Sequence, residues 1–195
     1  GATPVDNRFR DPTMARIDFT DWLPFDYSTY ELALVFVREQ RTPTGLPALG
    51  LRRNGNTGTL QGPAKSTSGP IQVSIWVGVF EDQEITSPQI RLLGLYPDGG
   101  SSVDLAPDES TPSQTLDGVT WTWWKADIPD GPVGWTTLRI VHRDDNIVFL
   151  NGPVLVPAGA GLKSSRSWRP VTRRPFTRAE RVNFSEYWKV YRDRF

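Results

Sequence analysis

Ile71-Gln72-Val73-Ser74-Ile75-Trp76-Val77-Gly78-Val79 decides the fold, because a β-branched residue occupies every odd position of this stretch. Successive side chains of a β-strand point to opposite faces, so the odd positions predict one apolar face. Other segments rich in Val, Ile, Leu, Trp, Phe and Thr repeat this pattern. They span residues 30–37, 50–53, 90–96, 119–124, 135–142, 147–150 and 154–156.

Pairs of turn-forming residues separate these segments and accept the backbone angles of tight turns. They include Asn54-Gly55, Asp98-Gly99, Asp117-Gly118, Asp130-Gly131 and Asn151-Gly152. The interior has no helical periodicity of useful length. About eight strands in an antiparallel β-sandwich or jelly roll are therefore predicted over residues 29–157, an all-β fold. The stretch 101–115, rich in Ser, Pro and Asp, is expected to be a long exposed loop.

The two ends of the chain break the strand pattern. Residues 1–28 are polar with separated aromatic residues, which predicts an extended N-terminal arm. Residues 158–195 begin with the flexible joint Ala158-Gly159-Ala160-Gly161 and continue through two prolines that keep the chain extended. Thr177-Arg178-Ala179-Glu180 fits a capping box, so a short helix is predicted near the C-terminus.

The C-terminal arm carries a charge opposite to that of the rest of the chain. Residues 163–195 hold ten of the 22 Lys and Arg and three of the 22 Asp and Glu, a net charge of +7 that leaves −7 on residues 1–162. Docking on a neighbouring subunit would use this attraction together with aromatic anchors. The residues expected to dock are Trp168, Arg169, Arg173, Arg174, Phe176, Arg178, Phe184, Tyr187 and Trp188. Nucleic acid is the less favoured partner, because the acidic body would repel it.

The composition offers little catalytic chemistry. Cysteine is absent and His142 is the only histidine, which excludes thiolate zinc sites and multi-histidine metal sites. The turn His142-Arg143-Asp144-Asp145-Asn146 could hold a cation, although an Asp-Asp-Asn turn needs no function. A glycosidase on this scaffold would need two carboxylates across a cleft, which sequence cannot pick out among 22 acids. No enzyme activity, cofactor or metal is expected.

Eight tryptophans are many for 195 residues, and Trp121-Thr122-Trp123-Trp124 places indoles on both faces of one strand. If Trp121 and Trp123 pack inside, Trp124 points outward, and Trp76 lies opposite the apolar face of its own strand. Such rings either pack under loops and subunit contacts or form a flat platform for a sugar ring. The sugar-binding hypothesis therefore expects Trp76 and Trp124 to be accessible.

Trp135-Thr136-Thr137-Leu138-Arg139-Ile140-Val141 and the stretch 146–156 form two alternating segments around a turn. Over residues 119–156 the pattern resembles galactose-binding-like jelly-roll β-sandwiches, found in carbohydrate-binding modules and in viral appendage and capsid proteins. The family's usual acidic pair in the last turn is Asn151-Gly152 here. The resemblance implies the fold more than the ligand.

These features favour a non-enzymatic structural protein of a large assembly. The expected setting is a phage or other virion, as a capsid decoration, minor capsid or tail protein that docks on its neighbours through its arms. The alternative is a carbohydrate-binding module or receptor-binding appendage with a glycan partner. No apolar run reaches the roughly 20 residues of a membrane helix, and the N-terminus lacks a signal-peptide pattern. A virion location is expected, with an extracellular or cytoplasmic soluble protein as the alternative.

Deletion of residues 163–195 should leave a folded sandwich that no longer assembles, because the basic aromatic anchors are removed while residues 29–157 remain. The solution mass of the full and truncated chains measures assembly, and circular dichroism checks folding. If the truncated chain unfolds, the tail belongs to its own core and the docking hypothesis is wrong.

Overall fold

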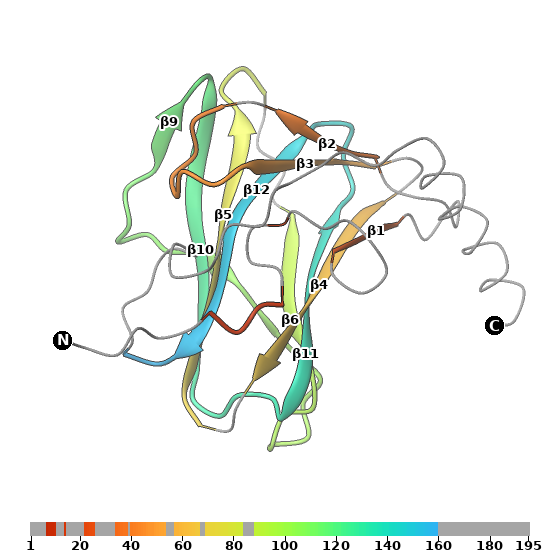
Figure 1. The fold of residues 1–195 in the computed structure, drawn as a ribbon, viewed down its shortest axis with the longest axis vertical. Helices are drawn as coiled ribbons and strands as arrows, with labels where there is room; N and C mark the ends of the chain where they lie inside the picture. Colours follow the sequence, from red (N-terminus) through yellow and green to blue (C-terminus); the bar gives the residue numbers. More distant parts are fainter. Residues whose placement is uncertain are drawn as a thin grey trace, which may run out of the picture.

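The computed structural model describes residues 7–10, 14, 22–25, 34–38, 40–53, 57–66, 69–83 and 88–159. Over these ranges the chain forms two β-sheets that pack face to face (Figure 1). Every strand pair in them is antiparallel, and no helix occurs in the described ranges. The predicted all-β antiparallel sandwich is confirmed.

One sheet has five strands, and β11 lies at its centre. In spatial order its members are β1 (Leu23–Phe25), β4 (Gly58–Ser66), β11 (Gly134–His142), β6 (Gln89–Leu93) and β7 (Ser102–Asp104).

The other sheet has seven strands, and β5 and β12 lie near its centre. Its spatial order is β2 (Leu34–Arg38), β3 (Ala48–Arg52), β12 (Val148–Pro157), β5 (Ile71–Phe80), β10 (Val119–Ile128) and β8 (Ala106–Pro107), while β9 (Gln114–Leu116) pairs with β10.

The predicted strand list needs correction in several places, and it also lacks β1. The segments 147–150 and 154–156 are parts of the single strand β12, which contains an irregularity between Asn151 and Val154 where Gly152 has a φ of 59°. A bulge of this kind interrupts the alternation without ending the strand. The expected loop 101–115 contains the short strands β7, β8 and the first residues of β9, which are too short and too exposed to show an apolar alternation.

Strand β4 is absent from the sequence prediction because Gly62 and Pro63 interrupt it. A Cβ atom at Gly62 would lie 2.6 Å from ring atoms of Trp22, so only glycine leaves room for the indole that covers the strand here. The Pro63 carbonyl accepts a hydrogen bond from the Arg10 N–H at 3.1 Å. Tertiary contacts, rather than local propensity, therefore make this segment a strand.

The core lies between the two sheets, and residues near the N-terminus are part of it. Phe9, Met14 and Trp22 are fully buried, and the Phe9 and Trp22 rings stack with centroids 5.9 Å apart. We expected residues 1–28 to be an arm that precedes the sandwich. Over the described residues 7–10, 14 and 22–25 this expectation is wrong, since the separated aromatic residues are core residues.

Residues 7–10 connect the two sheets. The Arg8 N–H donates to the Leu155 carbonyl of β12 at 2.9 Å, while the Lys65 N–H of β4 donates to the Arg8 carbonyl at 3.0 Å. The buried Asn7 amide donates to the Pro153 carbonyl at 2.7 Å and accepts from the Leu155 N–H at 3.1 Å. Figure 1 shows this short segment crossing between β12 and the five-stranded sheet.

The C-terminal arm beyond Gly159, with its predicted short helix and all its proposed docking residues, lies outside the described residues. In the part of the chain that the structure does describe, no helix has the length and apolar character needed to cross a membrane.

Replacement of Asn7 by Ala should destabilise the fold by roughly 2–3 kcal/mol, because buried backbone groups of β12 lose their partners. Urea unfolding monitored by tryptophan fluorescence measures this change. Gln114→Ala, at an exposed position of β9, is the control and should stay within about 0.5 kcal/mol of the parent. Equal effects of the two substitutions would contradict the role of Asn7 as a tie between the sheets.

Candidate functional site

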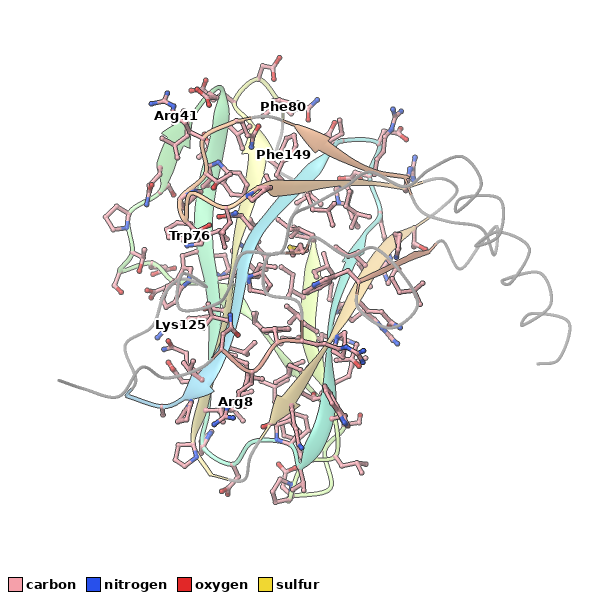
Figure 2. The ribbon with its side chains drawn as sticks, viewed as in Figure 1. Arg8, Arg41, Trp76, Phe80, Lys125 and Phe149 are labelled. Carbon is pink, nitrogen blue, oxygen red and sulfur yellow. The ribbon has the colours of Figure 1, made fainter. Side chains whose placement is uncertain are left out.

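The seven-stranded sheet is covered on its outer face as well as on its inner face. Trp76 is 6% exposed and belongs to a second apolar cluster on the outer face, whose other buried members are Ala48, Val119, Trp121, Trp123 and Phe149. Figure 2 shows Trp76, Phe80 and Phe149 along this sheet, and the last two rings meet edge to face at 5.1 Å. We call this group the outer tryptophan cluster.

The segment 40–47 lies over this cluster. Asn151, which pairs with Trp76 in the sheet, donates to the Leu46 carbonyl at 3.0 Å and accepts from the Thr44 hydroxyl at 2.8 Å. Arg41 forms an ion pair of 3.0 Å with Asp117 at the end of the same face. The outer tryptophan cluster is therefore closed off rather than open to a ligand.

Trp124 faces the other way, into the core between the sheets, and is 7% exposed. It pairs with Ile75, while Trp123 pairs with Trp76. The expectation that Trp76 and Trp124 are accessible is wrong for both rings. Strand parity correctly places Trp76 and Trp124 on opposite faces of the seven-stranded sheet. Both faces are apolar and covered, so parity alone could not show whether either ring is accessible.

The outer face of the five-stranded sheet is different, because polar side chains line it. On β11 and β6 these residues alternate with core residues such as Leu92 and Ile140 and so point away from the core. They border a groove of about 360 Å³ lined by Thr57, Gln89, Arg91, Leu93, Arg139, Val141 and Arg143. We call it the arginine groove.

A row of polar residues crosses four neighbouring strands at this groove. Arg139 of β11 is paired with Gln61 of β4 on one side and with Arg91 of β6 on the other, and Arg91 is paired with Asp104 of β7. Arg139 Nε donates to Gln61 Oε1 at 3.2 Å, and Arg91 Nε donates to Asp104 Oδ1 at 2.8 Å. The Gln89 amide, oriented with its oxygen towards Arg91, accepts from Nη2 at 2.5 Å and from Nε at 3.2 Å. Neighbours within the sheet thus orient both guanidinium groups.

An exposed indole lies on the same face. Trp135, near the start of β11, has the same strand parity as Arg139 and is 60% exposed, in contrast to the other tryptophans that the structure describes. Leu95 (79%) and Val133 (59%) are also exposed, and the Val133 N–H donates to the Leu95 carbonyl at 3.0 Å. The same face of the sheet therefore offers an apolar ring surface at one end of β11 and hydrogen-bonding groups further along the strands.

Tyr96 fixes the turn that carries Leu95. Its hydroxyl donates to the Leu92 carbonyl at 2.7 Å. Burial, with a smaller contribution from the negative charge of Asp98, raises the pKa of Tyr96 from 10.0 to about 12. The hydroxyl stays protonated at neutral pH, so this anchor of the turn is maintained.

The turn 142–146 is structural. His142, expected in an exposed turn, is the buried last residue of β11, and its Nε2 donates to the Asn146 carbonyl. Arg53 pairs with Asp145 at 2.9 Å and donates to the Arg143 carbonyl at 2.8 Å, which orders the turn. Among the described residues, no group of three or more His, Cys, Asp or Glu side chains could hold a metal ion.

The arginine groove was not anticipated from the sequence. One signal was available in the sequence. Trp135, Thr137, Arg139 and Val141 alternate with buried residues of the same strand, so they form an outward face of mixed polar and apolar side chains. The participation of Arg91 and Gln61 depends on strand pairing and has no local signal.

No protein-family model matches the chain, and no curated protein matches it. Solved structures do. The enzymatically active domain of bacteriophage CBA120 tailspike protein 4 aligns at a TM-score of 0.52 with 8% identity, over 80% of this chain and 22% of the tailspike chain. The chain thus spans about a fifth of that structure, and at this identity the likeness concerns the fold alone.

Carbohydrate-binding modules align less closely. The CBM22-1 xylan-binding domain from Paenibacillus barcinonensis Xyn10C gives a TM-score of 0.48 with 11% identity, over 82% of this chain and all of that domain. TmCBM61 in complex with β-1,4-galactotriose gives a TM-score of 0.43 with 15% identity, over 77% of this chain and 98% of that one. The predicted resemblance to jelly-roll sandwiches, which include viral appendages, is confirmed as one of fold by the tailspike domain.

Tyr96 should ionise near pH 12 in the folded chain and near pH 10 when unfolded. A folded-state pKa above the unfolded value means that the contribution of Tyr96 to stability is complete below pH 10 and is lost as the pH rises towards 12. The difference in tyrosinate absorbance between the parent and Tyr96→Phe isolates this group. Ionisation of Tyr96 near pH 10 in the folded chain would contradict its burial against β6.

Proposed function

We propose that this chain is a non-catalytic glycan-binding module whose ligand lies along the outer face of the five-stranded sheet. One observation carries the proposal: the 60% exposed Trp135 lies on the same face as the arginine groove. Among the described residues this is the place where an accessible aromatic ring and a polar groove share a surface.

The chemistry of this face suits a sugar. A pyranose ring has an apolar face that can stack on an indole, while its hydroxyls need donors and acceptors around the rim. Trp135 supplies the ring, and Gln89 and the arginines supply amide and guanidinium groups. Because Trp135, Arg139 and Arg91 stand on paired strands, little conformational entropy is lost on binding.

Binding is better supported than turnover. Glycoside hydrolysis uses two carboxyl groups on either side of the scissile bond. The described lining of the arginine groove contains arginine, glutamine, threonine and aliphatic side chains, and no carboxylate. The surface therefore offers recognition without the acid and base of a hydrolase.

A virion appendage is the biological setting that we favour for this module. A bacteriophage tailspike protein has a domain with the same fold, although that likeness extends to the fold alone. The opposite charges of residues 1–162 and 163–195 favour a second role, in which the C-terminal arm docks the module on other subunits of an assembly. The two roles are compatible, because they use different parts of the chain.

Replacement of Trp135 by Ala should weaken glycan binding about tenfold or more, because aromatic anchors dominate the energy of a binding surface. A glycan array identifies a ligand, and calorimetry with that ligand compares the variants. Trp135→Ala should leave the fold intact, since the ring is exposed.

Val133→Ala is the matched control, because Val133 is a neighbouring exposed apolar residue that offers no ring to stack. Its affinity should equal that of the parent. The proposal fails if the full chain binds nothing on a broad array of neutral and acidic glycans, or if Trp135→Ala binds as well as the parent.

A further inference from the structure

We infer that the glycan bound in the arginine groove is acidic and presents a carboxylate or sulfate group to Arg91 and Arg139. This inference rests on the proposed function and specifies its ligand class. It depends on the arrangement of charge in the groove.

Arg139 and Arg91 are direct cross-strand partners in the antiparallel pair of β11 and β6. Like charges placed directly opposite each other destabilise a sheet, so this pairing costs stability in the absence of a ligand. Asp104 balances Arg91 from the far side, on β7. An anion seated between the two guanidinium groups would remove the repulsion.

The guanidinium groups are also oriented in advance. Gln61 holds Nε of Arg139, while Asp104 and Gln89 hold Arg91. A planar guanidinium fixed in this way matches the two oxygens of a carboxylate or sulfate with paired hydrogen bonds. The uncharged hydroxyls of a neutral sugar would not form such charge-assisted pairs with the two arginines.

The groove is basic on an acidic body. Its described lining contains three arginines and no Asp or Glu, whereas residues 1–162 carry a net charge of −7. Such a local reversal concentrates positive potential in a concave surface, where it attracts an anion. The same acidic body disfavours a long polyanion such as nucleic acid, which would also run across the surrounding surface.

The test uses the full chain and two matched pairs of polymers in calorimetry: polygalacturonate with its carboxyl-reduced neutral derivative, and dextran sulfate with dextran. At least one acidic polymer should bind about tenfold more tightly than its neutral partner, the gain expected of a charge-assisted bidentate pair. A preference within the polygalacturonate pair indicates a carboxylate ligand, and a preference within the dextran pair indicates a sulfate. The preference should diminish with added salt.

Arg139→Gln should remove most of this preference and leave thermal unfolding unchanged or slightly raised, because it relieves the repulsion with Arg91. Arg139→Lys keeps the charge but lacks the planar fork, so it should retain part of the preference. Arg41→Gln is the control, because it makes the same change of charge in the segment that covers the other sheet, where Arg41 pairs with Asp117. It should leave the preference as in the parent.

If acidic and neutral polymers bind equally and both lose binding in Trp135→Ala, the inference of an acidic ligand is wrong, while the proposed glycan site is supported. Absence of binding to all four polymers and to a broad array would instead remove the proposed function itself. The inference is also overturned if Arg41→Gln weakens acidic polymers as much as Arg139→Gln, or if single-stranded DNA binds as tightly as the preferred acidic polymer.

Discussion

The pairing of β5 with β10 along ten residues of each strand places an apolar layer on both sides of the seven-stranded sheet. One layer is the core that this sheet shares with the five-stranded sheet, and the other is the outer tryptophan cluster beneath residues 40–47. Burial of large aromatic side chains on both faces is a major source of stability. It also leaves the outer face of the five-stranded sheet as the broad strand surface available for binding.

The outer face of the five-stranded sheet carries polar groups that lower the stability of the sheet but can bind a ligand. Two arginines opposite each other on adjacent strands, with an exposed indole at one end, do not improve the packing of a sheet. Gln61, Gln89 and Asp104 hold these side chains in place without filling the groove. The sandwich therefore combines a closed sheet that provides rigidity with an open sheet that carries the functional groups.

The alternation of residues 71–79 and 135–142 was sufficient to predict an antiparallel sandwich, because period-two patterns depend on local geometry. It was not sufficient for β4, whose Gly62 is required by the Trp22 indole, a contact between distant parts of the chain. The Trp121-Thr122-Trp123-Trp124 stretch predicts the wrong site because both its faces are buried, one by the five-stranded sheet and the other beneath residues 40–47. The arginine groove is assembled by pairing between β4, β6 and β11, which no single segment of sequence reveals.

The tie made by residues 7–10 constrains the order in which this chain can fold. Asn7 and Leu155 are hydrogen-bonded across a sequence separation of 148 residues, so the segment nearest the start of the described chain meets a strand nearest its end. Contacts of such separation form slowly, because a long loop must close before they stabilise anything. During synthesis the N-terminal segment can meet β4 early, but it lacks its partners in β12 until that strand has left the ribosome. The tie between the sheets at residues 7–10 therefore forms only after β12, the last strand of the described part of the chain, and until then the core around Phe9 is incomplete.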